Sequence, residues 1–253
     1  MKLWALARNT FREAVRDKVL LTLMVIAFLV TAAARLVPEL AAGEGTKIVQ
    51  DMGLKSMTLF CVLIAVLVGG RLVYREIEKR TIFVILAKPV ARWQFVLGKY
   101  LGLMLVLVVS VVLMTGWFAL FMVIFRVPMT PQMLLAVLLL VMELAVVTSI
   151  AVLFSTFVTP ISSAVFTFAV YFTGNMSTSL LYWGTRDKPM ALQLVARLFY
   201  YVLPNLANFD ITSAVVHRLP IDYARVGLSI GYALVYVAAA LLVATLVFRR
   251  RNF

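Results

Sequence analysis

The feature that most constrains the fold is a series of long, continuously apolar runs. A helix needs about 20 mostly apolar residues to cross a bilayer. Such runs lie at 19–37, 57–73, 98–125, 133–157, 161–183 and 224–248. They do not alternate between polar and apolar residues, which excludes a transmembrane β-barrel. Hydrophobic residues make up 64% of the 253 residues, against roughly 45–50% in soluble domains. The sequence therefore predicts an all-α polytopic membrane protein with six transmembrane helices.

The basic residues predict how the chain is oriented. Five Lys and Arg precede the first run, seven lie between Arg71 and Lys99, and three follow the last run, which places 15 of the 24 on one side. Because cytoplasmic loops carry the excess of Lys and Arg, we predict that both termini are cytoplasmic. The formal charge of +13 reflects this asymmetry, and no nucleic-acid partner is expected.

Cysteine and histidine are too scarce for a metal centre. Cys61 is the only cysteine and His217 the only histidine, so no disulfide can form within the chain and no zinc, haem or iron–sulfur site is expected. The sequence also has no Gly-x-x-x-x-Gly-Lys-Ser/Thr loop to hold the phosphates of ATP. We expect no cofactor in this chain.

Residues 1–18, before the first run, carry a helical pattern. Apolar side chains recur on one face, and Lys2, Arg8, Arg12 and Arg16 lie on the other. The pattern predicts an amphipathic helix along the inner membrane surface, in contact with membrane lipid. The alternative is a solvated start to the first span.

The segment 184–223 is the only long external connection. Pro189 could open a helix that Pro204 ends, and Asp210 could cap a second short turn that runs toward His217. Because these pieces are apolar yet too short to span, we predict short re-entrant or interfacial helices before the last span. A loop packed on the bundle is the alternative.

A basic loop at 75–97 connects the second and third runs. Its first turns mix both charge signs, and Ile77, Ile82, Ile85 and Leu86 give it an apolar face until Pro89 interrupts the pattern. A short amphipathic helix of this kind can lie at the membrane surface and present charged side chains to a soluble partner. The loop is predicted to be a docking element.

This loop resembles the corresponding loop in permease subunits of ABC exporters of the O-antigen and drug exporter superfamily, including the type associated with copper-enzyme maturation. That family carries Glu-x-Glu, a basic or glycine residue, Thr-Ile, then Leu-x-x-Pro-Val-x-Arg and Gly-Lys. The matching residues are Glu76, Glu78, Arg80, Thr81, Leu86, Pro89, Val90, Arg92, Gly98 and Lys99. The likeness extends more loosely over nearly the whole chain, so a single permease domain over 1–253, with the type V fold, is expected.

The resemblance implies that this chain forms the membrane-spanning permease and that a separate chain binds ATP. The 75–97 loop would be a cytoplasmic coupling helix that fits a groove of a separate ABC ATP-binding subunit. The residues implied in this contact are Glu76, Glu78, Arg80, Thr81, Pro89 and Arg92. Two permease copies, or this chain and a related one, would assemble with two ATPases in a bacterial or archaeal inner membrane. The ATPase would bind ATP and Mg, so the permease itself is not expected to be an enzyme.

A polar stripe in the fifth run could line a substrate pathway. Its members recur at helical spacing with Asn175 beside them, and they are Ser163, Thr167, Tyr171, Gly174 and Thr178. In the family that this chain resembles, the second and fifth spans flank the dimer interface, which favours a translocation route. Packing of small and hydroxyl residues between helices explains the stripe equally well.

Glu143 lies near the middle of the fourth run, where a charge costs at least about 2.5 kcal/mol. It is predicted to face protein or water, or to be protonated. One interpretation gives it a role in substrate binding or proton coupling. The other, which we favour, is a neutral carboxyl that bonds within the bundle, to Thr148 or to a facing helix.

The sequence as a whole predicts the permease subunit of an ATP-driven exporter. One alternative is a permease-like mechanotransmitter that passes ATPase motion to an external accessory protein. Another is a lipid-modifying membrane enzyme, which would need clustered acids or a nucleophile and base at one depth. Glu143 and His217 each stand alone, which disfavours an enzyme. Lipid-linked sugar, drug, peptide and sulfur species all remain open as substrates.

Overall fold

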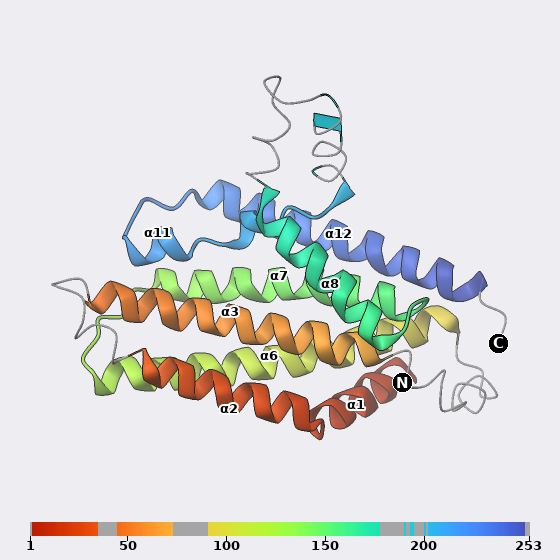
Figure 1. The fold of residues 1–253 in the computed structure, drawn as a ribbon, viewed down its shortest axis with the longest axis horizontal. Coiled ribbons are helices and arrows are strands. Elements are labelled where there is room, and N and C mark those ends of the chain that lie inside the picture. Colours follow the sequence, from red (N-terminus) through yellow and green to blue (C-terminus); the bar gives the residue numbers. More distant parts are fainter. Residues whose placement is uncertain are drawn as a thin grey trace.

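The described part of the chain is helical (Figure 1). The computed structural model describes residues 2–34, 45–72, 91–177, 190, 193–194, 200 and 202–250. Its elements are α1 (Lys2–Val15), α2 (Lys18–Ala33), α3 (Gly45–Leu72), α6 (Arg92–Ile124), α7 (Gln132–Ser155), α8 (Pro160–Asn175), the 3-10 helix η2 (Leu206–Phe209), α11 (Thr212–Val216) and α12 (Tyr223–Arg250). The prediction of an all-α protein is confirmed for these residues.

Among the described residues, four helices are long and apolar enough to cross a membrane: α3, α6, α7 and α12. They correspond to the second, third, fourth and sixth predicted runs. Helices α2 and α8 each have 16 residues. The predicted runs 19–37 and 161–183 continue past them into residues outside the described ranges. The number of six spans therefore stays a prediction.

Local sequence explains where several helices begin. Asp17 precedes α2, and its carboxylate accepts a hydrogen bond from the Val19 backbone N–H at 2.9 Å, as a helix cap does. Pro160 opens α8 at a position where its missing N–H costs nothing. Helix α6 begins at Arg92, so residues 92–97, which the apolar pattern assigns to the loop, form its first turns.

Helix α3 is longer than the predicted run because polar residues interrupt its apolar pattern. The run starts at 57, whereas α3 begins at Gly45. The polar residues of the additional turns find partners: the Gln50 side-chain amide donates to the Pro128 carbonyl at 2.7 Å, and Lys55 pairs with Asp210. A prediction based on consecutive apolar residues ends the span at such polar positions, although the helix continues through them.

Helix α3 lies inside the bundle, in contact with α2, α6, α7, α8 and α11. About two thirds (67%) of its most apolar stretch is buried, against 17% for α12, which packs on α7 at one side (Figure 1). The core residues between these helices include Cys61, Ile64, Leu103, Leu107, Leu139 and Leu144. Packing around α3 therefore holds the described helices together.

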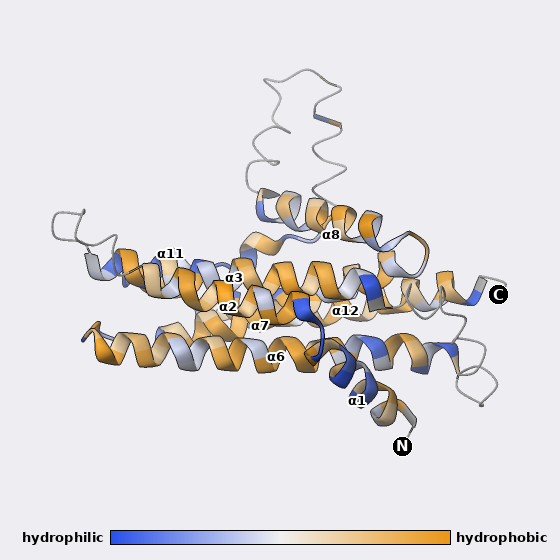
Figure 2. Ribbon diagram, turned by 60° about the horizontal axis from the view of Figure 1, so that its bottom comes forward, coloured by the Kyte–Doolittle hydropathy of each residue, from blue (hydrophilic) through white to orange (hydrophobic). Residues whose placement is uncertain are grey.

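Large hydrophobic side chains also cover the outside of the bundle. Orange, hydrophobic residues follow most of α2, α6 and α7 in Figure 2. Exposed examples on the outer helices are Leu29, Val112, Ile161, Phe172, Leu228 and Val235. An apolar surface of this extent is unfavourable in water. Lipid or another subunit must cover it, as expected of a membrane bundle.

One end of the bundle brings together the segments that border the predicted cytoplasmic regions. Helix α1, the first turns of α6 and the last turns of α12 lie at this end, which we call the base (Figure 1). Helix α11 and the first turn of α12 lie toward the opposite end. The base is therefore the end that the charge distribution predicts to be cytoplasmic.

Candidate functional site

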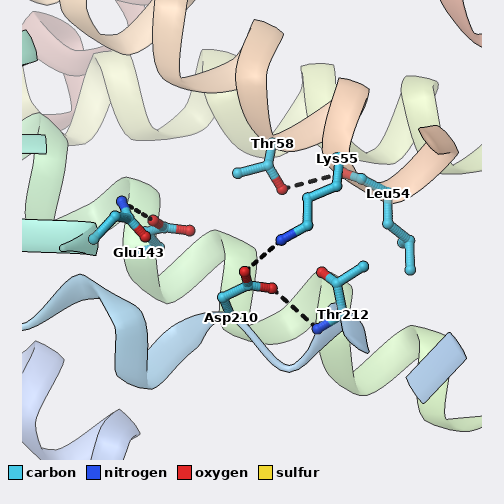
Figure 3. A network of polar contacts seen from close by, with 7 residues as sticks. Leu54, Lys55, Thr58, Glu143, Asp210 and Thr212 are labelled. Carbon is cyan, nitrogen blue, oxygen red and sulfur yellow. Dashed lines mark hydrogen bonds and ion pairs between the residues drawn. The ribbon is translucent and has the colours of Figure 1, made fainter. Parts of the chain in front are cut away.

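Five polar residues from three helices and one link lie close together, and they range from the buried Glu143 to the partly exposed Lys55 and Asp210. Lys55 comes from α3, Glu143 from α7, Tyr171 and Asn175 from α8, and Asp210 from the link between η2 and α11. We call them the central polar cluster. Figure 3 shows Lys55 and Asp210 pointing toward each other, with Glu143 nearby. The Asn175 side chain connects Glu143 to the Tyr171 backbone carbonyl.

Glu143 is 3% exposed and takes its hydrogen bond from a facing helix. The Asn175 side-chain amide donates to Glu143 Oε1 at 3.4 Å, and to the Tyr171 carbonyl of its own helix at 3.1 Å. Thr148, the neighbouring residue considered as a partner, has no hydrogen-bond partner for its hydroxyl within the described residues. A residue five positions along a helix points to a different face, so Thr148 cannot follow Glu143 toward α8.

Lys55 and Asp210 form an ion pair that links α3 to the segment before α11. Both side chains are partly exposed, 45% for Lys55 and 38% for Asp210. The other Asp210 carboxylate oxygen accepts a hydrogen bond from the Thr212 backbone N–H at 3.0 Å (Figure 3). Asp210 thus holds the beginning of α11, the short turn that the sequence predicts toward His217, and anchors it to α3.

The pKa of Asp210 follows from these contacts. Partial burial alone would raise the pKa of the carboxyl, but the hydrogen bonds from Lys55 and Thr212, together with the Lys55 charge, bring it below the ordinary value. Asp210 is therefore ionised throughout the physiological pH range. The link between α3 and α11 is accordingly present at neutral pH.

The predicted stripe on α8 divides between two environments. Ser163 and Thr167 are buried: the Ser163 hydroxyl donates to the Ala151 carbonyl of α7 at 3.3 Å, and the Thr167 hydroxyl donates to the Ser163 carbonyl at 2.7 Å. Tyr171 and Asn175 are half-buried beside Glu143. Thr178 lies outside the described residues. The structure thus brings Tyr171 and Asn175 to the cluster and places Ser163 and Thr167 in helix packing.

Of the six residues implied in ATPase coupling, only Arg92 is described. Glu76, Glu78, Arg80, Thr81 and Pro89 lie outside the described ranges. The Arg92 guanidinium donates to the Phe248 carbonyl at 3.2 Å and to the Arg249 carbonyl at 2.6 Å. The last carbonyls of a helix lack partners within it and carry partial negative charge. Arg92 therefore connects the first turn of α6 to the end of α12.

Aromatic packing strengthens the same connection. The rings of Phe95 and Phe248 stack with centroids 5.4 Å apart and planes 13° apart. Both side chains are buried, in a small apolar group that also contains Val96, Val152 and Ala244. The first turns of α6 and the last turns of α12 thus form one packed unit at the base.

Sequence reasoning missed Lys55 and the partnership of Asp210. Lys55 lies just before the predicted second run, so the apolar pattern places it in an external loop. The two residues are 155 positions apart, and no local pattern pairs them. An intramembrane or near-membrane charge that needs an opposite charge was the only available signal.

We predict that Asp210→Asn loosens the segment around α11. The substitution removes the ion pair with Lys55, so amide hydrogen exchange of residues 211–216 should become about two- to fivefold faster, the range for a partly exposed pair. Mass spectrometry of the full chain in nanodiscs measures this rate. Asp222→Asn is the matched control, because it removes a more exposed pair between Asp222, just before α12, and Arg225 in its first turn; equal acceleration in both variants would contradict the assignment.

The same measurement has a defined pH dependence. Because the pKa of Asp210 is lowered in the folded chain, the link is complete above the ordinary aspartate pKa of about 3.9 and is lost as the pH falls through the lower folded value. After correction for intrinsic exchange, the exchange rates of residues 211–216 should therefore differ between the wild type and Asp210→Asn at pH 5. The two rates should become equal only below about pH 4. Convergence already at pH 6 would show that another group controls this segment.

Comparison with known proteins identifies the family. The family model described as "ABC-2 family transporter protein" matches residues 4–253, nearly the whole chain. No curated protein matches this sequence. Within the described residues there is also no group of three His, Cys, Asp or Glu that could hold a metal ion. The bundle of long apolar helices and the family match agree, and this chain belongs to the ABC-2 family of transporter proteins, as a transmembrane permease component of an ABC transporter.

Proposed function

We propose that this permease couples ATP hydrolysis by a separate ATP-binding subunit to the export of a substrate. The observation that carries the proposal is the clamp at the base, in which Arg92 bonds to two carbonyls at the end of α12. Arg92 belongs to the predicted coupling loop at 75–97, which resembles a coupling helix. A force applied to that segment would reach α6 through the chain and α12 through the clamp.

The ATPase would act at the base and the substrate route would lie near the central polar cluster. Two ATP-binding subunits would close on ATP and displace the coupling segments of two permease copies. Helix α6 runs from the base along the bundle and contacts α3 and α7, which carry Lys55 and Glu143. Nucleotide binding would move α6 against these helices, and this movement would change the positions of the residues in the central polar cluster.

The Lys55–Asp210 pair supports a lid at the external end. It ties the segment of η2 and α11 to α3, beside the half-buried residues Tyr171 and Asn175. Opening outward would require this pair to separate, while the inward-facing state keeps it. The cluster therefore supports a substrate route between α3 and α8, with a second permease copy on the other side.

One observation favours a second candidate, transmission of motion to an external partner. A cavity of about 570 Å³ lies between the η2–α11 segment and the first turns of α12, at the end opposite the base. Its lining mixes apolar residues with charged and polar ones, among them Asp210, Asp222, Arg225 and Tyr232. An external protein could bind there and follow the same motion of α11. Transport by a reconstituted complex without such a protein separates export from transmission.

The coupling proposal predicts that the double substitution Glu76→Lys and Glu78→Lys uncouples the complex. Reversing two charges at the proposed ATPase contact should lower transport at least tenfold while the basal ATPase rate remains. Transport and ATP hydrolysis are measured on the same proteoliposomes. Glu39→Lys with Glu44→Lys is the matched control on the opposite predicted side, and normal coupling in the Glu76 and Glu78 variant would contradict the proposal.

Glu143 is proposed to be a neutral carboxyl that holds α8 against α7. Glu143→Gln should therefore keep transport within about twofold of wild type from pH 6 to pH 8, because glutamine can still accept the bond from Asn175. Glu143→Leu should lower transport or stability, since it leaves the half-buried amide of Asn175 without this acceptor. Loss of the wild-type pH dependence in Glu143→Gln would instead assign proton coupling to this residue.

A further inference from the structure

Helix α1 is docked on α6 by close contact between small residues. A side chain at Gly98 would clash with Leu6, since a Cβ added there would lie 2.6 Å from the leucine Cδ2. A Cβ at Gly102 would lie 2.7 Å from the Ala7 carbonyl and 2.5 Å from Thr10. Ala7, Thr10 and Ala14 are buried in this contact. One face of α1 is therefore buried against protein.

The acidic side chains near α1 each lie near a basic residue of another helix. Glu13 Oε2 lies 3.7 Å from Nζ of Lys99, a fully buried lysine of α6. Asp17, after α1, caps α2 and lies 3.9 Å from an Arg71 guanidinium nitrogen. These carboxylates pair with basic residues of α6 and α3, although the Glu13 side chain stays 40% exposed.

The outer face of α1 carries basic residues at regular spacing. Arg8, Arg12 and Arg16 follow one another at intervals of four residues, which places them on successive turns of one face. All three are exposed, and Trp4, one turn before Arg8, is 64% exposed. Hydrophilic residues follow α1 in Figure 2, in contrast to the apolar helices beside it. The exposed surface of α1 thus carries three arginines, with Glu13 as the one acidic side chain among them.

The position of α1 puts this basic face at the edge of the membrane. The apolar helix α2 begins at Lys18, three residues after α1 ends at Val15. On α6, the docking site at Gly98 and Gly102 is where the predicted apolar run begins. A tryptophan beside arginines at this level is typical of the interface between lipid tails and headgroups.

We propose that the outer face of α1 binds anionic phospholipid headgroups of the leaflet next to the base. Arg8, Arg12 and Arg16 contact the headgroup phosphates, and Trp4 lies among the headgroups. Because α1 is fastened to α6 through Gly98, Gly102 and the Glu13–Lys99 pair, bound lipid holds the base at a fixed depth. The assignment goes beyond the coupling function and does not depend on it.

The test measures lipid binding by the full chain in detergent. Phosphatidylglycerol and phosphatidylcholine with the same acyl chains are titrated separately, and bound lipid is counted by native mass spectrometry. Each arginine near an anionic surface strengthens binding about fivefold. Arg8→Gln with Arg12→Gln and Arg16→Gln should therefore weaken phosphatidylglycerol binding at least tenfold and leave phosphatidylcholine binding unchanged.

Two further variants make the result specific. Arg126→Gln with Arg218→Gln and Arg225→Gln removes three exposed arginines away from α1 and should keep wild-type binding. The triple Arg-to-Lys variant at 8, 12 and 16 keeps the charge and should keep most of the preference, which separates charge from folding. Unchanged phosphatidylglycerol binding in the first variant, or equal loss in both glutamine variants, overturns the proposal. Loss of a co-purifying ATPase with unchanged lipid binding would assign this face to protein instead.

Discussion

A bilayer offers no hydrogen-bond partners to the groups inside it, and this constraint determines both the fold and the polar sites of this protein. Backbone groups pair within helices, which leaves buried polar side chains such as Glu143 in need of partners from other elements. Asn175 of α8 supplies the partner of Glu143, and the partly exposed Lys55 pairs with Asp210. These polar contacts add to the apolar packing that already connects α3, α7 and α8.

The polar contacts divide into two groups at different levels of the bundle. At the base, Arg92 and Phe95 join α6 to the end of α12, and Lys99 joins α6 to α1. Farther along the bundle, the central polar cluster joins α3, α7, α8 and the segment before α11. Helix α6 takes part in the first group and packs on the helices of the second. It is thus the element best placed to carry motion between the proposed ATPase contact and the proposed substrate route.

The sequence predicts the elements that follow from apolar composition. It does not predict the features that depend on contacts between residues far apart in the chain. Four apolar runs become long helices, and the likeness carried by the 75–99 segment agrees with the family match. The start of α3 was missed because Gln50 and Lys55 look like loop residues until Pro128 and Asp210 are placed beside them. The Gly98 and Lys99 pair resembles a family motif, but only the structure shows that α1 lies against it. The six-span count and the pathway role of the α8 stripe stay predictions.

The central claim of the proposal is that the base moves as one unit and that the segment of η2 and α11, which is predicted to be external and is called the external segment, responds to it. Spin labels at Trp93→Cys and Leu246→Cys would report the base, and labels at Leu59→Cys and Ser213→Cys the external segment, in a Cys61→Ala background. Pulsed electron resonance on complexes with one labelled chain gives each distance with and without trapped ATP. We predict an unchanged distance in the base pair and a shifted distance in the external pair. Separation of α6 from α12 at the base, with a fixed external distance, would contradict this claim.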